Sequence, residues 1–129
     1  MVIDTSALLA ILLDEPERRP YNEAIEAADA RVMSVASFVE VSIVLEVRYG
    51  AEGLRALDRF IERAGIELAP VDVEQARVAR DAFSHYGKGR HAAALTFGDC
   101  FSYALAHVLG EPLLFKGNDF SRTDVRRLM

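Results

Sequence analysis

The feature that most constrains the fold is an alternation of short apolar runs with longer helical patterns. The chain opens with the apolar run Met1–Ile3, which stops at Asp4, and similar short runs follow at residues 31–35, 66–71 and 111–115. Between them, apolar residues recur three or four positions apart, the spacing of a helix that buries one face. This alternation predicts an α/β fold with a parallel sheet and helices on both of its faces.

The predicted helices carry polar residues near their N-terminal ends, where side-chain oxygens accept hydrogen bonds from unpaired backbone N–H groups. The expected caps are Thr5 or Ser6 for a buried helix over residues 7–13, Ser37 for a long helix running to Tyr49, and Asp72 for the helix after the third strand. Glycine commonly ends a helix with a left-handed backbone, and Gly50 and Gly110 stand where two of these helices are expected to stop. A short basic helix is predicted at the C-terminus.

The length and composition are typical of one domain spanning residues 1–129. With 51% hydrophobic residues, the chain has enough apolar surface for a core without disulfides or structural metals. Cys100 is the only cysteine, so no internal disulfide forms, and its apolar helix predicts a core position. The apolar run Ala7–Leu13 is far shorter than the roughly 20 residues of a membrane span, and it lacks the basic flank of a signal peptide. We therefore expect a cytoplasmic protein without membrane association.

Four acidic residues from distant parts of the chain are predicted to meet at one edge of the sheet. Asp4 follows the first strand, and Asp119 lies in the loop after the fourth. Glu40 is expected in the first turn of the helix after the second strand, and Asp99 in the first turn of the helix before the fourth. Ligands of open parallel sheets bind beyond the carboxyl ends of the strands, where these acids would lie. Taken singly, each is also explained as a helix cap or a solvated turn residue.

The chemistry of such a cluster favours a hard divalent cation. Carboxylates held close together repel one another, and a cation removes that cost. Oxygen ligands without His or Cys favour Mg²⁺, with Mn²⁺ as a substitute, over zinc. Such an ion acidifies water and neutralises charge on a phosphoryl group. The residues therefore predict metal-dependent phosphodiester hydrolysis, with Asp4, Glu40, Asp99 and Asp119 as metal ligands and catalytic residues.

Four segments, in the same order along the chain, resemble PIN-domain ribonuclease toxins of the VapC type. They are the N-terminal Met-Val-Ile-Asp-Thr-Ser-Ala-Leu, the segment Ser37-Phe-Val-Glu40, the loop Tyr86-Gly-Lys-Gly-Arg-His91 leading to residues 97–106, and Leu113-Leu-Phe-Lys-Gly-Asn-Asp-Phe120. The resemblance implies a PIN-like three-layer α/β/α sandwich with a short, mostly parallel sheet of four to five strands. It also implies a Mg²⁺-dependent endoribonuclease acting on structured RNA, such as tRNA or rRNA loops.

The same resemblance implies partners and roles for individual residues. Such toxins are usually homodimers, form larger assemblies with a VapB-type antitoxin, and are inhibited by it. Asp4, Glu40, Asp99 and Asp119 match the family's acidic quartet, and Thr5 and Ser6 match hydroxyl positions that support the metal shell. The chain departs from the family at two positions. Gly117 stands where many members carry another acid, and Thr96 replaces a frequent Asn.

The distribution of charge qualifies an argument against RNA. A net charge of −5, from 20 Asp+Glu and 15 Lys+Arg, argues weakly against a polynucleotide partner. However, residues 1–84 hold 16 acids and 9 bases, whereas residues 85–129 hold 4 acids and 6 bases. Lys88, Arg90, His91 and Lys116 are candidates for contacts with RNA phosphates. An ordinary solvated loop explains the first three equally well.

Two other classes are excluded by the residues after the first strand. An aspartyl phosphatase needs a second Asp two positions after the first, where this chain has Ser6. A nucleotide-binding module needs a glycine-rich loop, which the Thr5–Leu8 segment does not supply. The remaining alternative is a catalytically silent relative that binds RNA or a protein, and the presence of all four acids argues against it.

Overall fold

The short apolar runs form a central sheet in the computed structural model, which describes all 129 residues. The strands are β1 (Val2–Ile3), β2 (Val32–Ser34), β3 (Glu67–Ala69) and β4 (Leu113–Leu114), and they lie in the order β3-β2-β1-β4. All three pairings are parallel. The predicted parallel sheet is confirmed, and it has four strands. At the β4 edge, Arg127 adds only an isolated parallel bridge to Leu113.

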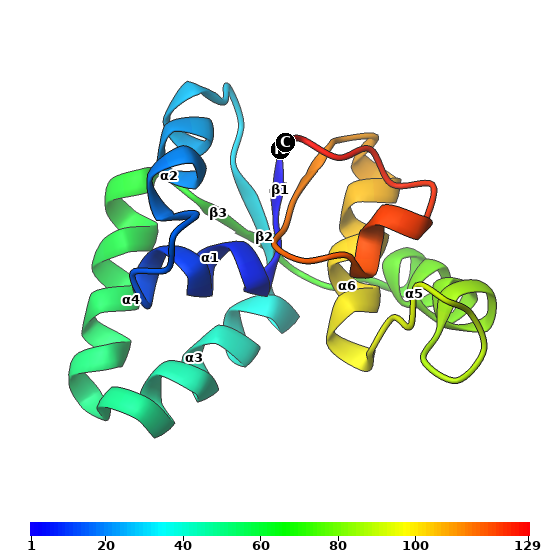
Figure 1. Ribbon diagram of the computed structural model, residues 1–129, viewed down its shortest axis with the longest axis horizontal. Coiled ribbons are helices and arrows are strands. Elements are labelled where there is room, and N and C mark those ends of the chain that lie inside the picture. The colour runs from blue at the N-terminus through cyan, green and yellow to red at the C-terminus, as the bar shows by residue number, and fades with distance from the viewer.

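Six α-helices cover the two faces of this sheet. They are α1 (Thr5–Leu12), α2 (Arg18–Ala27), α3 (Val35–Tyr49), α4 (Ala51–Ala64), α5 (Val73–Tyr86) and α6 (Phe97–Leu109). Figure 1 shows α1 to α4 on one side of the strands and α5 with α6 on the other, which is the predicted three-layer sandwich. None of the helices has the length and apolar character needed to cross a membrane.

The strands β1 and β4 are wholly apolar, and β2 begins with two apolar residues, because both faces of the sheet are buried at these strands. The edge strand β3 instead begins with the exposed Glu67. Successive side chains of a strand point to opposite faces. Ile3 and Met33 accordingly pack in the core beneath α1 to α4, whereas Val2 and Val32 pack in the core beneath α5 and α6. This alternation fixes the register of β1 against β2 and therefore the place where each strand ends.

Two of the predicted helix caps were wrong, because the strands pass into the helices with at most one residue between them. Asp4, and neither Thr5 nor Ser6, caps α1 by accepting a hydrogen bond from the backbone N–H of Ser6 at 3.0 Å. Ser34, and not Ser37, caps α3. Glu40 consequently lies in the second turn of α3 rather than the first. The predicted cap at Asp72 is confirmed, and Thr96 caps α6.

The C-terminal segment does not form the predicted basic α-helix. It contains a single 3-10 turn, η1 (Asp119–Arg122), and then continues as an irregular chain. Buried Phe120 anchors the turn in the core. The backbone of Leu113 then bonds with Arg126 and Leu128, which holds the tail extended beside β4. Pairing with the sheet edge therefore replaces the hydrogen bonds that a terminal helix would need.

Candidate active site

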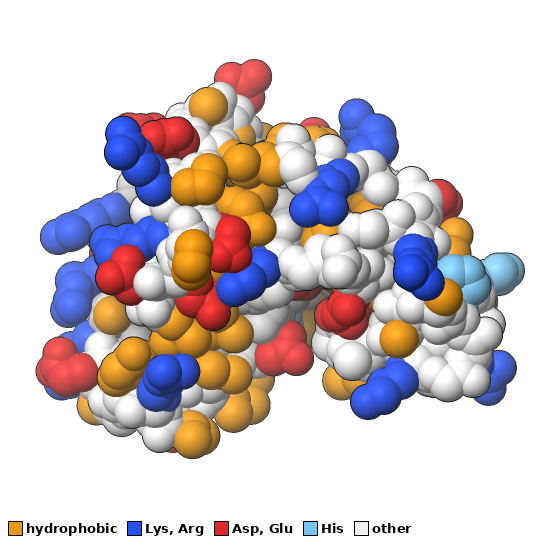
Figure 2. All heavy atoms as spheres, viewed as in Figure 1, with side chains coloured by type: hydrophobic (Ala, Val, Ile, Leu, Met, Phe, Trp, Pro, Cys, Tyr) orange, Lys and Arg blue, Asp and Glu red, His pale blue; other side chains and the backbone are white.

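Three of the four predicted acids lie in segments that follow the carboxyl ends of strands, and the fourth lies at the start of the helix before β4. Asp4 comes directly after β1, and α3 with Glu40 comes directly after β2. Asp99 lies in the first turn of α6, and Asp119 begins η1 after β4. Figure 2 shows a hollow between the surface over α3 and the surface over the lower end of α6, with acidic side chains on both sides of it.

Asp4 is held rigidly at the base of this site. Its side chain is only 3% exposed. The carboxylate oxygen Oδ1 accepts a hydrogen bond from the Ser102 hydroxyl at 2.5 Å. The other oxygen, Oδ2, accepts from the Ser6 hydroxyl at 2.6 Å and from the Ser6 backbone N–H at 3.0 Å. Burial raises the pKa of Asp4, the hydrogen bonds lower it, and the nearby charge of Glu40 raises it further.

Asp99 takes part in the cap of α6 and has a raised pKa. It forms a capping box with Thr96, accepting a hydrogen bond from the Thr96 backbone N–H at 2.9 Å. Burial raises the pKa of Asp99 to about 6, and the negative charges of Asp4 and Asp119 contribute to the rise. The cap interpretation is therefore confirmed, and the cap places the carboxylate of Asp99 near the charges of Asp4 and Asp119.

Glu40 reaches from α3 to the first turn of α6. A Cβ atom at Gly98 would lie 2.8 Å from Oε1 of Glu40 and nearer still to Oε2. Only glycine at this position leaves room for the carboxylate. Glu40 thus lies beside the residue that precedes Asp99, although the two acids come from helices on opposite sides of the sheet.

The four acids are neighbours, but they do not form a preassembled cage. The structure contains no group of three or more His, Cys, Asp or Glu side chains placed to hold a metal ion. Asp4 is fixed by hydrogen bonds, whereas Glu40 and Asp119 are exposed. The donor set nevertheless fits a hard divalent cation, because it consists of carboxylate oxygens. Burial, and to a smaller extent the charges of the neighbouring acids, raise the pKa of Asp4 and Asp99, and a bound cation would offset both effects.

The two predicted supporting hydroxyls behave differently. The Ser6 hydroxyl contacts Asp4 and also accepts a hydrogen bond from the Lys116 backbone N–H at 3.0 Å, so it ties the end of β4 to the site. The Thr5 hydroxyl lies 3.5 Å from the carbonyl oxygen of Ser37 and does not contact Asp4. Sequence reasoning missed Ser102 and Ser37 as site residues. The available signal was a serine three positions from an acid in an otherwise apolar stretch of helix.

The predicted RNA-binding residues lie in two separate segments, and most of them contact other side chains. The Lys116 ammonium forms ion pairs with Glu15 and Glu17, each at 3.2 Å. Arg90 lies over the ring of Phe83, 5.6 Å from its centre. His91 packs edge-on against Tyr86, and Lys88 is exposed. Lys116 follows β4 at the site, whereas the other three belong to the loop after α5.

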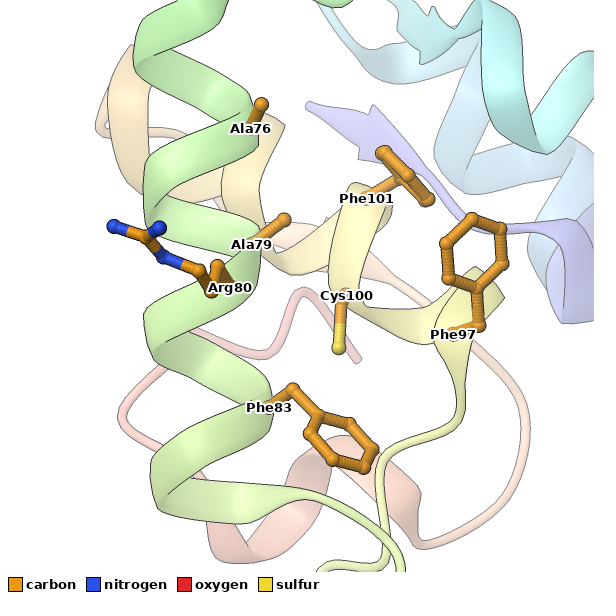
Figure 3. A pocket seen from close by; sticks show the side chains of 7 residues that line it. All are labelled: Ala76, Ala79, Arg80, Phe83, Phe97, Cys100 and Phe101. Carbon is orange, nitrogen blue, oxygen red and sulfur yellow. The ribbon is translucent and has the colours of Figure 1, made fainter.

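An apolar groove of about 450 Å³ lies beside the acidic edge, between α5 and α6. Figure 3 shows Phe83, Phe97 and Cys100 directed into it, while the guanidinium of Arg80 points outward. Cys100 is buried, as predicted, and burial raises the pKa of its thiol. A buried thiol kept in its neutral form is a packing residue and not a nucleophile.

The parallel sheet, its flanking helix layers and the acids at one edge define a class of protein, and a family model identifies it. The model described as "PIN domain" matches residues 1–126, so this chain belongs to the PIN-domain family. Its relatives in that family are named VapC ribonucleases. It is 53% identical over 125 residues to Ribonuclease VapC30 of Mycobacterium tuberculosis, covering 97% of this chain and 95% of the relative. It is 55% identical over 125 residues to Ribonuclease VapC of Mycolicibacterium smegmatis, covering 97% of each.

Solved structures agree on the fold. The crystal structure of Mycobacterium tuberculosis VapC20, described as a sarcin–ricin loop cleaving toxin, superimposes with a TM-score of 0.79 at 16% identity and covers 98% of this chain and 97% of that one. A toxin–antitoxin complex from Klebsiella pneumoniae gives a TM-score of 0.69 at 19% identity, covering 95% of this chain and 92% of that one. The predicted PIN fold and the resemblance to VapC proteins are therefore confirmed.

Proposed function

We propose that this protein is a Mg²⁺-dependent endoribonuclease, the toxin of a VapBC-type toxin–antitoxin pair that acts in the cytoplasm. The observation that carries the proposal is the meeting of Asp4, Glu40, Asp99 and Asp119 at one sheet edge, where the charges of Asp4 and Asp119 help to raise the pKa of Asp99. Identity of 53% to 55% with named VapC ribonucleases supports the same activity.

Each acid has a role in this proposal. Asp4, Asp99 and Asp119 would hold Mg²⁺, for which Mn²⁺ substitutes, and Glu40 would either join them or help to position the attacking water. When bound, the ion neutralises charge on the phosphate and acidifies water. Attack by water leaves a 5′-phosphate and a 3′-hydroxyl without using the ribose 2′-hydroxyl. The substrate is an unpaired loop of structured RNA, because proteins read RNA mainly where bases are unstacked.

The proposal is tested by incubating the purified protein with total bacterial RNA in Mg²⁺ or in EDTA and sequencing the new ends. Expected are discrete cuts with 5′-phosphates that need Mg²⁺ or Mn²⁺ and disappear when the cognate antitoxin is added. The alternative is a catalytically silent PIN protein that binds RNA, and it is favoured by the lack of a preassembled three-acid cage. Growth arrest on induced expression without any cut RNA would establish that alternative.

Replacing Gly98 with Ala is expected to lower RNA cleavage about tenfold, a loss typical of disturbing a residue around a metal site. The added methyl group displaces the Glu40 carboxylate, which is exposed and free to move, so thermal stability is expected to stay unchanged. Cleavage rates and melting temperatures check both parts. If Gly98 acts through Glu40, then Gly98→Ala combined with Glu40→Gln loses no more activity than Glu40→Gln alone. Additive losses would contradict this explanation.

The homodimer belongs to the proposal as well, and α3 offers a surface for it. Val39, Ile43 and Val47 are 51%, 59% and 84% exposed and lie four positions apart, so they form one apolar stripe. Apolar side chains gathered on one exposed face mark an interaction surface.

Val47→Asp is expected to convert the dimer into monomer, because it places a charge in the centre of an apolar contact. Light scattering at micromolar concentration measures the change in mass. Val73→Asp is the matched control, since Val73 is 67% exposed but lies on α5. A Val47→Asp variant with the parental mass would show that this stripe is not the interface.

A further inference from the structure

Two buried serines lie one helical turn from two of the acids. Ser37 precedes Glu40 by three positions on α3, and Ser102 follows Asp99 by three on α6. Residues three apart share a face of a helix, so each serine lies beneath an acid. Ser37 is 1% exposed and Ser102 is completely buried. Burying a hydroxyl costs free energy unless the group is hydrogen-bonded, so we expect both hydroxyls to have hydrogen-bond partners.

The two hydroxyls form a hydrogen-bonded chain that ends on Asp4. The Ser102 hydroxyl donates to Oδ1 of Asp4, and the oxygens of Ser37 and Ser102 lie 3.1 Å apart. An ionised carboxylate only accepts, and a serine hydroxyl has one proton to donate. The proton of Ser102 is therefore committed to Asp4, and Ser37 must donate to Ser102. The hydrogen bonds therefore run from Ser37 through Ser102 to Asp4, and they join α3, α6 and the start of α1.

These hydroxyls also determine which oxygen of Asp4 remains available. An ionised carboxylate has about four acceptor positions. Ser6 occupies two of them on Oδ2, through its hydroxyl and its backbone N–H. Ser102 occupies one on Oδ1. The position that remains is on Oδ1, the oxygen that Ser102 holds in place.

We propose that Ser102, backed by Ser37, is a positioning pair that orients Asp4 toward a divalent cation and fixes the spacing of the helices that carry Glu40 and Asp99. This rests on the proposed function, because it takes Asp4 to be a metal ligand. Neither serine contacts the reacting atoms, so both act through the acids. Groups that orient metal ligands typically contribute about 10- to 100-fold to metal affinity.

Mn²⁺ binding to the full chain, measured by titration calorimetry, tests the pair. Ser102→Ala is expected to weaken binding by about 10- to 100-fold, and Ser37→Ala by less. Because Ser37 acts only through Ser102, the double variant is expected to bind no more weakly than Ser102→Ala alone. Ser42→Ala is the matched control, since the Ser42 hydroxyl donates to the carbonyl of Phe38 within α3 and has no hydrogen bond to any of the four acids. Its binding is expected to equal that of the parent.

Cleavage kinetics separate positioning from a merely structural role. The Mg²⁺ concentration for half-maximal rate is expected to rise for Ser102→Ala by the same factor as the Mn²⁺ dissociation constant, while kcat at saturating Mg²⁺ recovers. A structural role would lower the melting temperature and leave the Mg²⁺ requirement unchanged, and that result would overturn the proposal. Affinity of Ser102→Ala within about twofold of the parent would do the same.

If Ser102→Ala does not fold, the comparison between Ser37→Ala and Ser42→Ala decides in the same way. A parent chain that binds no Mn²⁺ and cuts no RNA would instead refute the proposed function itself.

Discussion

Replacing Asp4 with Asn is expected to lower RNA cleavage by more than about a hundredfold, because even the partners of metal ligands contribute 10- to 100-fold. Asp4 is the acid that the fold holds most firmly, with three hydrogen bonds to its carboxylate and almost no exposure. Asn has no negative charge, so the variant loses the one metal-binding carboxylate that no other side chain can replace by rotating. Rates measured with the same RNA over a range of Mg²⁺ concentrations give the size of the loss.

The fold is expected to survive this change. Asn caps helices about as well as Asp. Its carbonyl oxygen can accept a hydrogen bond from the Ser6 backbone N–H, while its amide group donates to the Ser102 hydroxyl. The Ser102 hydroxyl can then donate to Ser37. Burial also disfavours the charged form of Asp4, so the neutral variant loses no stability on that account. Melting temperatures check this expectation.

Asp72→Asn provides the matched control for Asp4→Asn. Asp72 is also a helix-capping aspartate, accepting a hydrogen bond from the backbone N–H of Gln75 at 2.8 Å, but it caps α5 and not the site. Parental cleavage is expected for this variant. Parental cleavage by Asp4→Asn, in a preparation free of other nucleases, would remove Asp4 from the metal site.

The features that sequence predicted well depend on local patterns. A strand of two or three apolar residues that stops at an acid is visible in Met1–Asp4, and β1 lies there with Asp4 at its carboxyl end. The order of strands and helices then places Asp119 at the same edge, because parallel strands end on one side of a sheet. Helix starts were less predictable. Ser34 and Ser37 are equally good caps, and only the direct passage from β2 into α3 selects the first.

The features that sequence did not predict are contacts between distant segments. The hydrogen bond from Ser102 to Asp4 joins residues 98 positions apart, and it depends on how closely α6 crosses the end of β1. The ion pairs of Lys116 depend likewise on the loop between α1 and α2, which carries Glu15 and Glu17. A residue type alone does not indicate which of several neighbours it will meet. For that reason Lys116 was predictable as a basic residue at the site but not as a paired one.

Replacing Asp99 with Asn separates the two roles of this residue. Asn keeps a side-chain oxygen that can accept from the Thr96 backbone N–H, so the cap of α6 is retained, but the negative charge is lost. If Asp99 is a metal ligand, cleavage is expected to fall by more than about a hundredfold, as for Asp4.

Thr96→Ala makes the opposite change. It removes the hydroxyl that accepts from the Asp99 backbone N–H and keeps the carboxylate. Loss of such a cap costs about 1 kcal/mol of stability, and cleavage is expected to persist.

The pH dependence of stability gives a second, independent measurement on Asp99. Its pKa of about 6 in the folded protein is above its ordinary value of 3.8, so the folded state binds the proton more tightly than the unfolded state does. In a buffer with chelator, this residue therefore contributes most to stability below about pH 4, and its contribution falls as pH rises to about 6. Asp99→Asn is expected to lack that decline in urea unfolding series. Added Mg²⁺ should reverse the decline in the parent, because an ion bound to the carboxylate replaces the proton. A parent and variant with identical pH profiles would show that burial and the neighbouring acids do not raise the pKa of Asp99. If Asp99→Asn cleaves RNA at the parental rate while Thr96→Ala is less stable than the parent, Asp99 acts only as a helix cap.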